Sequence, residues 1–154
     1  MTNTIITRKK LTTNQRVKHT AKLFGVRFPF NIESAIFSIA GKLASEYDGA
    51  YWEFYSLSNG GFYMAPRMGN LYAVSCINGY KDSMSADALG ITACMYAYSH
   101  LSFSSDPGFA EVCANHYHRL RAYIFQHEEG SAIFSAIDWQ KNSLRNQIKI
   151  TKPR

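Results

Sequence analysis

The stretch YWEFYSLSNGGFYMAP, residues 51–66, has the pattern of a β-hairpin. Side chains two apart share one face of a strand, and in residues 51–57 both faces carry aromatic rings. Ser58-Asn59-Gly60-Gly61 supplies residues that tolerate a positive φ angle, as tight turns require. The aromatic run that follows ends at Pro66. The stretch predicts two antiparallel strands, covered by other parts of the chain on both faces.

A third strand is expected directly after this hairpin. Apolar residues alternate with small or polar ones over residues 71–77, until Asn78-Gly79 provides a further turn. Together with the hairpin, this segment predicts a three-stranded antiparallel meander.

Segments with helical periodicity precede and follow the predicted strands in the sequence. Apolar residues recur three to four apart over residues 32–47, 89–103, 109–124 and, briefly, 133–137. Each segment follows a residue that can cap a helix N-terminus: Asn31, Ser83 or Ser85, Asp106 with Pro107 behind it, and Ser131. The sequence predicts a single compact α+β domain, in which about four helices cover a small three-stranded antiparallel sheet.

The formal charge of +6 is spread unevenly over the 154 residues. Residues 1–27 hold seven bases and no acids, and residues 141–154 hold five bases and no acids. The segment between them, residues 28–140, holds eleven acids and five bases, a formal charge of −6. We expect a flexible basic segment at residues 1–16, a folded domain at residues 17–140 and a basic tail at residues 141–154.

Several classes of protein are excluded by composition. No run approaches the roughly 18 apolar residues of a membrane span, and no apolar run follows the basic start as in a secretory signal. We therefore expect a soluble, cytoplasmic protein without a membrane partner. The odd number of cysteines fits poorly with a disulfide framework, so Cys76, Cys94 and Cys113 are expected to be reduced and buried.

Catalytic and metal-binding patterns are weak. His116 and His118 lie two apart on an expected helix, so they point in different directions, and Cys113 with His116 gives only two ligands. No Gly-x-Ser-x-Gly motif occurs, and Asn59-Gly60-Gly61 leads into a strand rather than a phosphate-binding helix. The sequence predicts no catalytic residues, no metal and no cofactor.

The sequence favours a contact surface for a partner over a catalytic or metal-binding site. An exposed row of aromatic side chains that includes Tyr63, beside Arg67, would mark a site for a partner. The alternative is that most aromatic side chains of the strands lie in the core. The basic ends could bind DNA phosphates, although terminal runs of this kind are more often solvated tails.

Three blocks of the sequence resemble the ArdB/KlcA antirestriction family. The first is residues 51–66, quoted above. The second is MSADALGITA at 84–93, running on to SHLSF at 99–103, and the third is HYHRLR at 116–121 with AI at 132–133 and AID at 136–138. The resemblance spans about residues 17–138, and its first block is long and unusual.

The resemblance implies a compact α+β protein, encoded on a plasmid or mobile element, that relieves restriction of incoming unmodified DNA by type I restriction-modification enzymes. It implies inhibition without catalysis. It also implies a fold unlike the acidic proteins that imitate DNA. The charge distribution independently disfavours imitation of DNA. Eleven acids spread over residues 33–138, with five bases among them, fall far short of the one negative charge per 1.7 Å of axis that duplex DNA carries.

The family supplies no catalytic residues, so the predicted site is a partner contact. We predict the hairpin tip, with two neighbours and one carboxylate that needs a partner: Asn59, Gly60, Gly61, Tyr63, Arg67 and Asp138. Asp138 can equally be a helix-end residue or part of a local salt bridge. The partner is the type I machinery, bound directly or through a host factor. The alternative function is a nucleic-acid-binding accessory protein of a mobile element that uses its basic ends.

Overall fold

The computed structural model describes residues 5–67, 69 and 71–138. In chain order the elements are β1 (Arg8–Lys10), α1 (Thr13–Phe24), the single π-helical turn η1 (Phe28–Ile32), α2 (Glu33–Leu43), β2 (Trp52–Leu57), β3 (Phe62–Pro66), β4 (Tyr72–Ser75), β5 (Lys81–Met84), α3 (Ala86–Leu101) and α4 (Pro107–Ile124). Residues 130–138 are also helical. The expected α+β class is confirmed.

The predicted hairpin is confirmed as β2 and β3. Tyr55 lies opposite Tyr63, and Trp52 lies opposite Pro66. Gly60 has a φ of 90°, the left-handed geometry for which glycine suits the turn. Both strands are almost entirely buried, so the hairpin is covered on both faces, as its sequence predicted.

The third strand of the sheet is not the predicted one. The sheet order is β1-β2-β3, with Lys9 of β1 opposite Ser56. The segment expected to complete the meander instead forms β4, which pairs with β5 in a separate two-stranded hairpin. β1 carries three exposed charged side chains and β5 three exposed polar ones, so neither shows the alternation by which a strand is recognised. β1 pairs through its backbone as an edge strand.

The folded part of the chain also begins earlier than expected. Thr12 caps α1, its hydroxyl accepting from the backbone N–H of Gln15, and the Gln15 side chain accepts from the N–H of Thr12 in return. The expected boundary between residues 16 and 17 thus falls inside a helix, because this reciprocal cap starts α1 before its first apolar residue. The basic tail at residues 141–154 lies outside the described residues.

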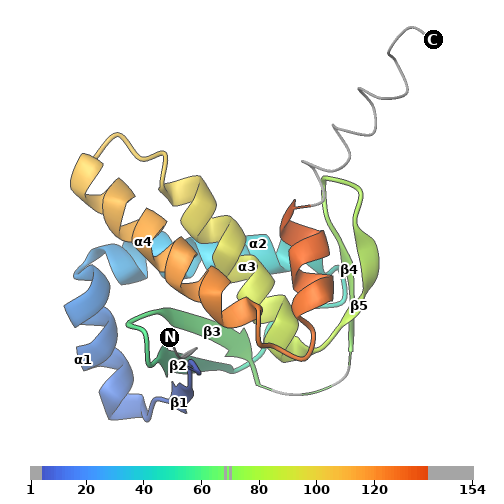
Figure 1. Ribbon diagram of the computed structural model, residues 1–154, viewed down its shortest axis with the longest axis horizontal. Coiled ribbons are helices and arrows are strands. Elements are labelled where there is room, and N and C mark those ends of the chain that lie inside the picture. The colour runs from blue at the N-terminus through green and yellow to red at the C-terminus, as the bar shows by residue number, and fades with distance from the viewer. Residues whose placement is uncertain (1–4, 68, 70, 139–154) are drawn as a thin grey trace, which may run out of the picture.

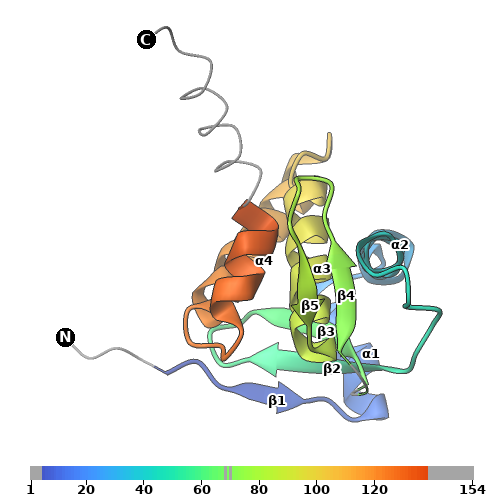
Figure 2. The ribbon, with the colours of Figure 1, turned by 90° about the vertical axis from the view of Figure 1, so that its right-hand side faces the viewer.

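α3 is the central helix. The hydroxyl of Ser85 caps it, as predicted, by accepting from the N–H of Ala88. α3 packs against β3 on one side and against α2 and α4 on others, and its middle is buried all round. The views in Figure 1 and Figure 2 show α2, α3 and α4 on one side of the sheet and β4–β5 lying along α3.

The outer helices are capped partly as predicted. The Asp106 carboxylate accepts from the N–H groups of Gly108 and Phe109 at the start of α4. Asn31 does not cap α2, because η1 continues directly into this helix and leaves no free N-terminus there.

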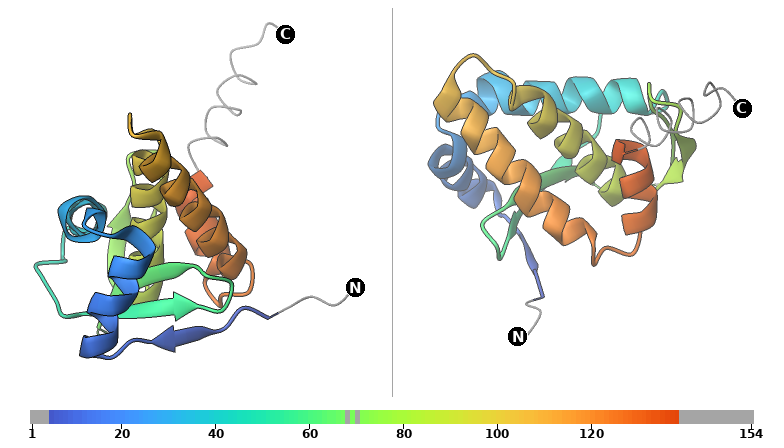
Figure 3. Two further views of the ribbon diagram at one scale, coloured as in Figure 1. Left: turned by 90° about the vertical axis from the view of Figure 1, so that its left-hand side faces the viewer. Right: turned by 45° about the horizontal axis from the view of Figure 1, so that its top comes forward.

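None of the helices within the described residues is both long and apolar enough to cross a membrane. Figure 3 shows α1 at the edge of the sheet, apart from the three packed helices.

Candidate functional site

Glu53 is a buried carboxylate on β2 that gathers basic side chains around the hairpin. Its oxygens accept from Arg16 Nη2 at 3.0 Å and from Arg67 Nε at 2.9 Å, and Lys10 Nζ lies 3.8 Å away. Burial raises the pKa of Glu53, but the three cations outweigh it and hold the pKa below its usual value. These residues, which we call the Glu53 cluster, tie β1, α1 and the end of β3 to β2.

Asp87, in the first turn of α3, is the centre of a second cluster. Its Oδ1 accepts from Arg8 Nη1 at 2.8 Å and from the Tyr63 hydroxyl at 2.9 Å, and its Oδ2 lies 2.7 Å from His127 Nε2. The N–H of Glu129 donates to His127 Nδ1, so Nε2 carries the ring proton and donates to Asp87. Burial alone raises the pKa of Asp87, but its donors outweigh this effect and lower it. This Asp87 cluster joins β1, β3 and α3 to the loop after α4.

The hairpin tip is held against α4 by Asn59. Its Nδ2 donates to the backbone oxygen of Arg119, and its Oδ1 accepts from the N–H of Gly61. Gly60 is exposed beneath the Arg119 guanidinium, while Gly61 is buried. Of the predicted tip residues, Gly60 is the exposed one, and Asn59 already has structural partners for its amide.

The remaining predicted contact residues lie apart from the tip. Tyr63 is fully buried, with its ring stacked between Tyr55 and Tyr123, which corrects the expectation of an exposed aromatic row. Arg67 is exposed, but it follows the other end of β3 and lies over Tyr51 in the Glu53 cluster. Asp138 pairs with Arg121 of α4 through both of its oxygens.

The six residues therefore do not form one surface. Sequence reasoning also missed Glu53 and Asp87, whose partners come from segments distant along the chain. The only sequence signal for them was a carboxylate within an otherwise apolar pattern.

Among the described residues, neither the cysteines nor the histidines form an evident catalytic or metal-binding site. All three cysteines are buried and free, as predicted. Burial raises the pKa of the Cys94 thiol to about 12 and that of Cys113 to about 11, so neither is a ready nucleophile. Over residues 5–67, 69 and 71–138, no three His, Cys, Asp or Glu side chains are grouped to hold a metal ion.

His116 is a core residue whose titration should be visible in stability. Its ring packs on Phe24 at 4.6 Å and on Tyr98 at 5.7 Å, and burial lowers its pKa to about 4. In the unfolded chain its pKa is about 6.5, so protons favour unfolding between these two values.

We expect His116 to remove about 2 kcal/mol of stability between pH 7.5 and pH 5, and His116→Phe to abolish this contribution while keeping the stacked ring. Urea unfolding of both proteins at the two pH values measures it. His118→Gln, at an exposed position on the same helix, is the control and should keep the wild-type pH dependence. An identical loss in wild type and His116→Phe would contradict the assignment.

The carboxylates are partly used inside the protein. Four of the eleven are in ion pairs with arginines: Glu53, Asp87, Asp106 and Asp138. Paired carboxylates cannot present the regular array of free charge found along DNA. The described body therefore lacks the surface of an acidic DNA mimic.

A family model places this fold among known proteins. Residues 45–138, from the segment after α2 to the last described residue, match the family described as "Antirestriction protein". The chain belongs to the antirestriction protein family. The three blocks of sequence described above, between residues 51 and 138, all lie within the part that this model covers.

The chain is also similar in sequence to individual proteins. The chain is 35% identical to antirestriction protein KlcA of Escherichia coli over 126 residues, which is 80% of this chain and 89% of that protein. It is 39% identical over 110 residues to the uncharacterized protein YafX of E. coli K12, covering 70% of each chain.

A solved structure is also similar, with a TM-score of 0.82 and 34% identity over 90% of this chain and 99% of the other. It comes from the KlcA and ArdB proteins, which show a novel fold and antirestriction activity against type I DNA restriction systems in vivo but not in vitro.

Proposed function

We propose that this protein relieves restriction of incoming unmodified DNA by type I restriction-modification systems, as an inhibitor without catalytic activity. The observation that carries the proposal is the match to the KlcA and ArdB structure over 99% of that chain, at 34% identity. Fold alone does not define function, but here family, sequence and fold point to one activity.

The inhibitor acts by contact other than DNA mimicry. Residues 28–140 have a formal charge of −6 only, the fold also includes the seven bases of residues 8–27, and arginines hold four of the carboxylates. Its partner is the type I machinery, reached directly or through a host factor in the bacterial cytoplasm. KlcA and ArdB act in vivo but not in vitro, which favours a component or state of the enzyme that purified assays lack.

Plating efficiency of unmodified phage tests the proposal. Cells with a type I system should give few plaques without the protein and many with it, while a host without the system should give equal numbers in both cases. Unchanged plating on the restricting host would refute the function.

Titration of the protein into cleavage by a purified type I enzyme distinguishes the two routes. Relief in cells with full cleavage in the tube would identify a host factor or a cellular state, and inhibition in both would identify direct binding.

A nucleic-acid-binding role is the second candidate, and one structural feature favours it. Lys9 on β1 and both Lys18 and Lys22 on α1 are exposed, in a segment without acids up to Arg27. Such binding would be independent of sequence and weakened by salt. Duplex binding measured across salt concentrations decides it, because affinity that does not fall with salt would exclude phosphate contacts.

A further inference from the structure

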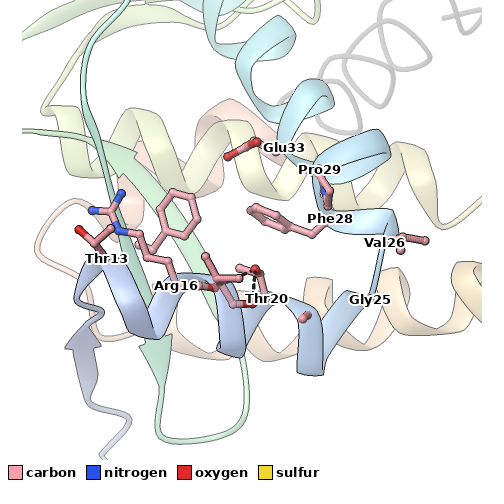
Figure 4. A pocket seen from close by; sticks show the side chains of 11 residues that line it. Thr13, Arg16, Thr20, Gly25, Val26, Phe28, Pro29 and Glu33 are labelled. Carbon is pink, nitrogen blue, oxygen red and sulfur yellow. Dashed lines mark hydrogen bonds between the residues drawn. The ribbon is translucent and has the colours of Figure 1, made fainter.

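An apolar groove of about 590 Å³ lies between α1 and η1. α1 ends at Phe24, and Gly25 turns the chain with a φ of 60° into η1, so the two segments diverge and leave a space between them. Figure 4 shows Phe28, Pro29 and Glu33 on one side of this space, side chains of α1 on the other, and Val26 on the connection between the two. The volume is within the range of sites that hold ligands or side chains.

One charged side chain that lines the groove has no partner among the described residues. Glu33 lines the groove in the first turn of α2, and no described side chain or backbone group pairs with its carboxylate. Burial without compensation raises its pKa. Arg16, which also lines the groove, is paired with Glu53 through its Nη2.

The groove is open along an exposed apolar rim. Val17 and Val26, which both line it, are 71% and 73% exposed. Apolar side chains that gather in this way at the surface mark contacts with other proteins. A small molecule held in the groove would leave most of this rim in water.

The charge in the groove selects among possible occupants. An unpaired carboxylate beside apolar walls repels phosphates and carboxylates, and it attracts a cation that follows an apolar group. Phosphates and acidic side chains are therefore disfavoured at Glu33 itself.

We propose that this groove binds a segment of a partner protein that places a large apolar side chain between α1 and η1 and a lysine or arginine against Glu33. The inference rests on the proposed function, since the segment would belong to the restriction machinery or to the host factor through which it is inhibited.

Peptide titration followed by amide chemical shifts tests the site directly. The probes are acetyl-Lys-Phe-Leu-Lys-amide and its counterpart with both lysines replaced by glutamate. The lysine peptide should shift amides of residues 13–33 and bind about tenfold more tightly, a difference of about 1.4 kcal/mol. Equal affinities, shifts elsewhere in the protein, or no binding would each overturn the proposal.

Variants of the groove sharpen this test. Glu33→Gln should reduce the preference for the lysine peptide to below about threefold, and Glu33→Lys should reverse it. Val26→Asp should abolish binding, whereas Phe103→Asp, at an apolar side chain that is 86% exposed and outside the groove, should retain it. Glu33→Gln should unfold no more easily than wild type, because the carboxylate that it removes is uncompensated.

Alternative occupants give distinct outcomes. Phenethylamine binding as tightly as the peptide would indicate a small-molecule site. Shifts of the same amides on neutralising the basic tail, with no peptide present, would identify the chain's own tail. Both results would overturn the proposal.

Phage plating separates failure of this inference from failure of the function. Val26→Asp and Glu33→Lys should lose relief of restriction, and Phe103→Asp should keep it. Full relief by Val26→Asp would refute the groove's role and leave the antirestriction function standing, while no relief by wild type would refute the function itself.

Discussion

Gly90→Val is expected to prevent folding, because α3 approaches β3 most closely at this glycine. A Cβ at residue 90 would lie 2.4 Å from both the Cα and the Cβ of Ala65 and 2.5 Å from the backbone oxygen of Met64. These atoms are part of the strand backbone or bonded directly to it, so they cannot move aside as a flexible side chain would. Even Gly90→Ala should cost about 3 kcal/mol or more, a large fraction of the 5–15 kcal/mol that stabilises a typical domain.

Gly41→Ala in α2 is the matched control. This glycine is also helical, but no atom lies within 4 Å of the position where its Cβ would be. Alanine should stabilise the protein by about 0.5–1 kcal/mol through its higher helix propensity. Thermal unfolding followed by circular dichroism measures both variants. A folded Gly90→Val protein with the wild-type melting temperature would contradict the described packing of α3 on β3.

Glu53→Gln is expected to destabilise the protein by about 3 kcal/mol, because it leaves Arg16 without its charge partner in the protein interior. The Arg16 side chain is 15% exposed, whereas those of Lys10 and Arg67 are 60% and 59% exposed, so the loss falls mainly on Arg16. Glu111→Gln, at an exposed carboxylate of α4, should change stability by less than about 0.5 kcal/mol.

The pH dependence gives Glu53→Gln a second test. The cations hold the pKa of Glu53 below its unfolded value, despite burial, so the carboxylate stabilises the fold above that unfolded value of roughly 4.3. This contribution is lost as the pH falls through the folded pKa. Urea unfolding should show wild type and variant converging below about pH 4, and a gap that stays constant down to pH 3 would contradict the ion-pair explanation.

Much of the fold follows from local sequence signals. The turn at residues 58–61 and the caps Ser85 and Asp106 specify their elements through short-range hydrogen bonds and backbone geometry, and the structure confirms them. β1 and β5 could not be recognised in the same way, because their side chains are polar and their pairing is made by the backbone.

The surface was harder to predict than the fold. Aromatic residues on both faces of a hairpin do not reveal which ring a helix covers, and Tyr123 of α4 covers Tyr63. Glu33 was not predicted as part of a site, because the groove around it depends on the angle between α1 and η1. Long-range geometry of this kind leaves no pattern in the sequence.

Phage plating with a charge-altered tail tests the central claim most directly, namely that the folded body relieves restriction and the basic tail at residues 141–154 does not. The full-length variant carries glutamine at Lys141, Arg145, Lys149, Lys152 and Arg154, and Gly90→Val serves as the unfolded control. On a type I restricting host, the account predicts that unmodified phage plate equally well with wild type and the tail variant, and poorly with Gly90→Val. Loss of relief in the tail variant, with its melting temperature unchanged, would contradict the account and assign the activity to the basic tail.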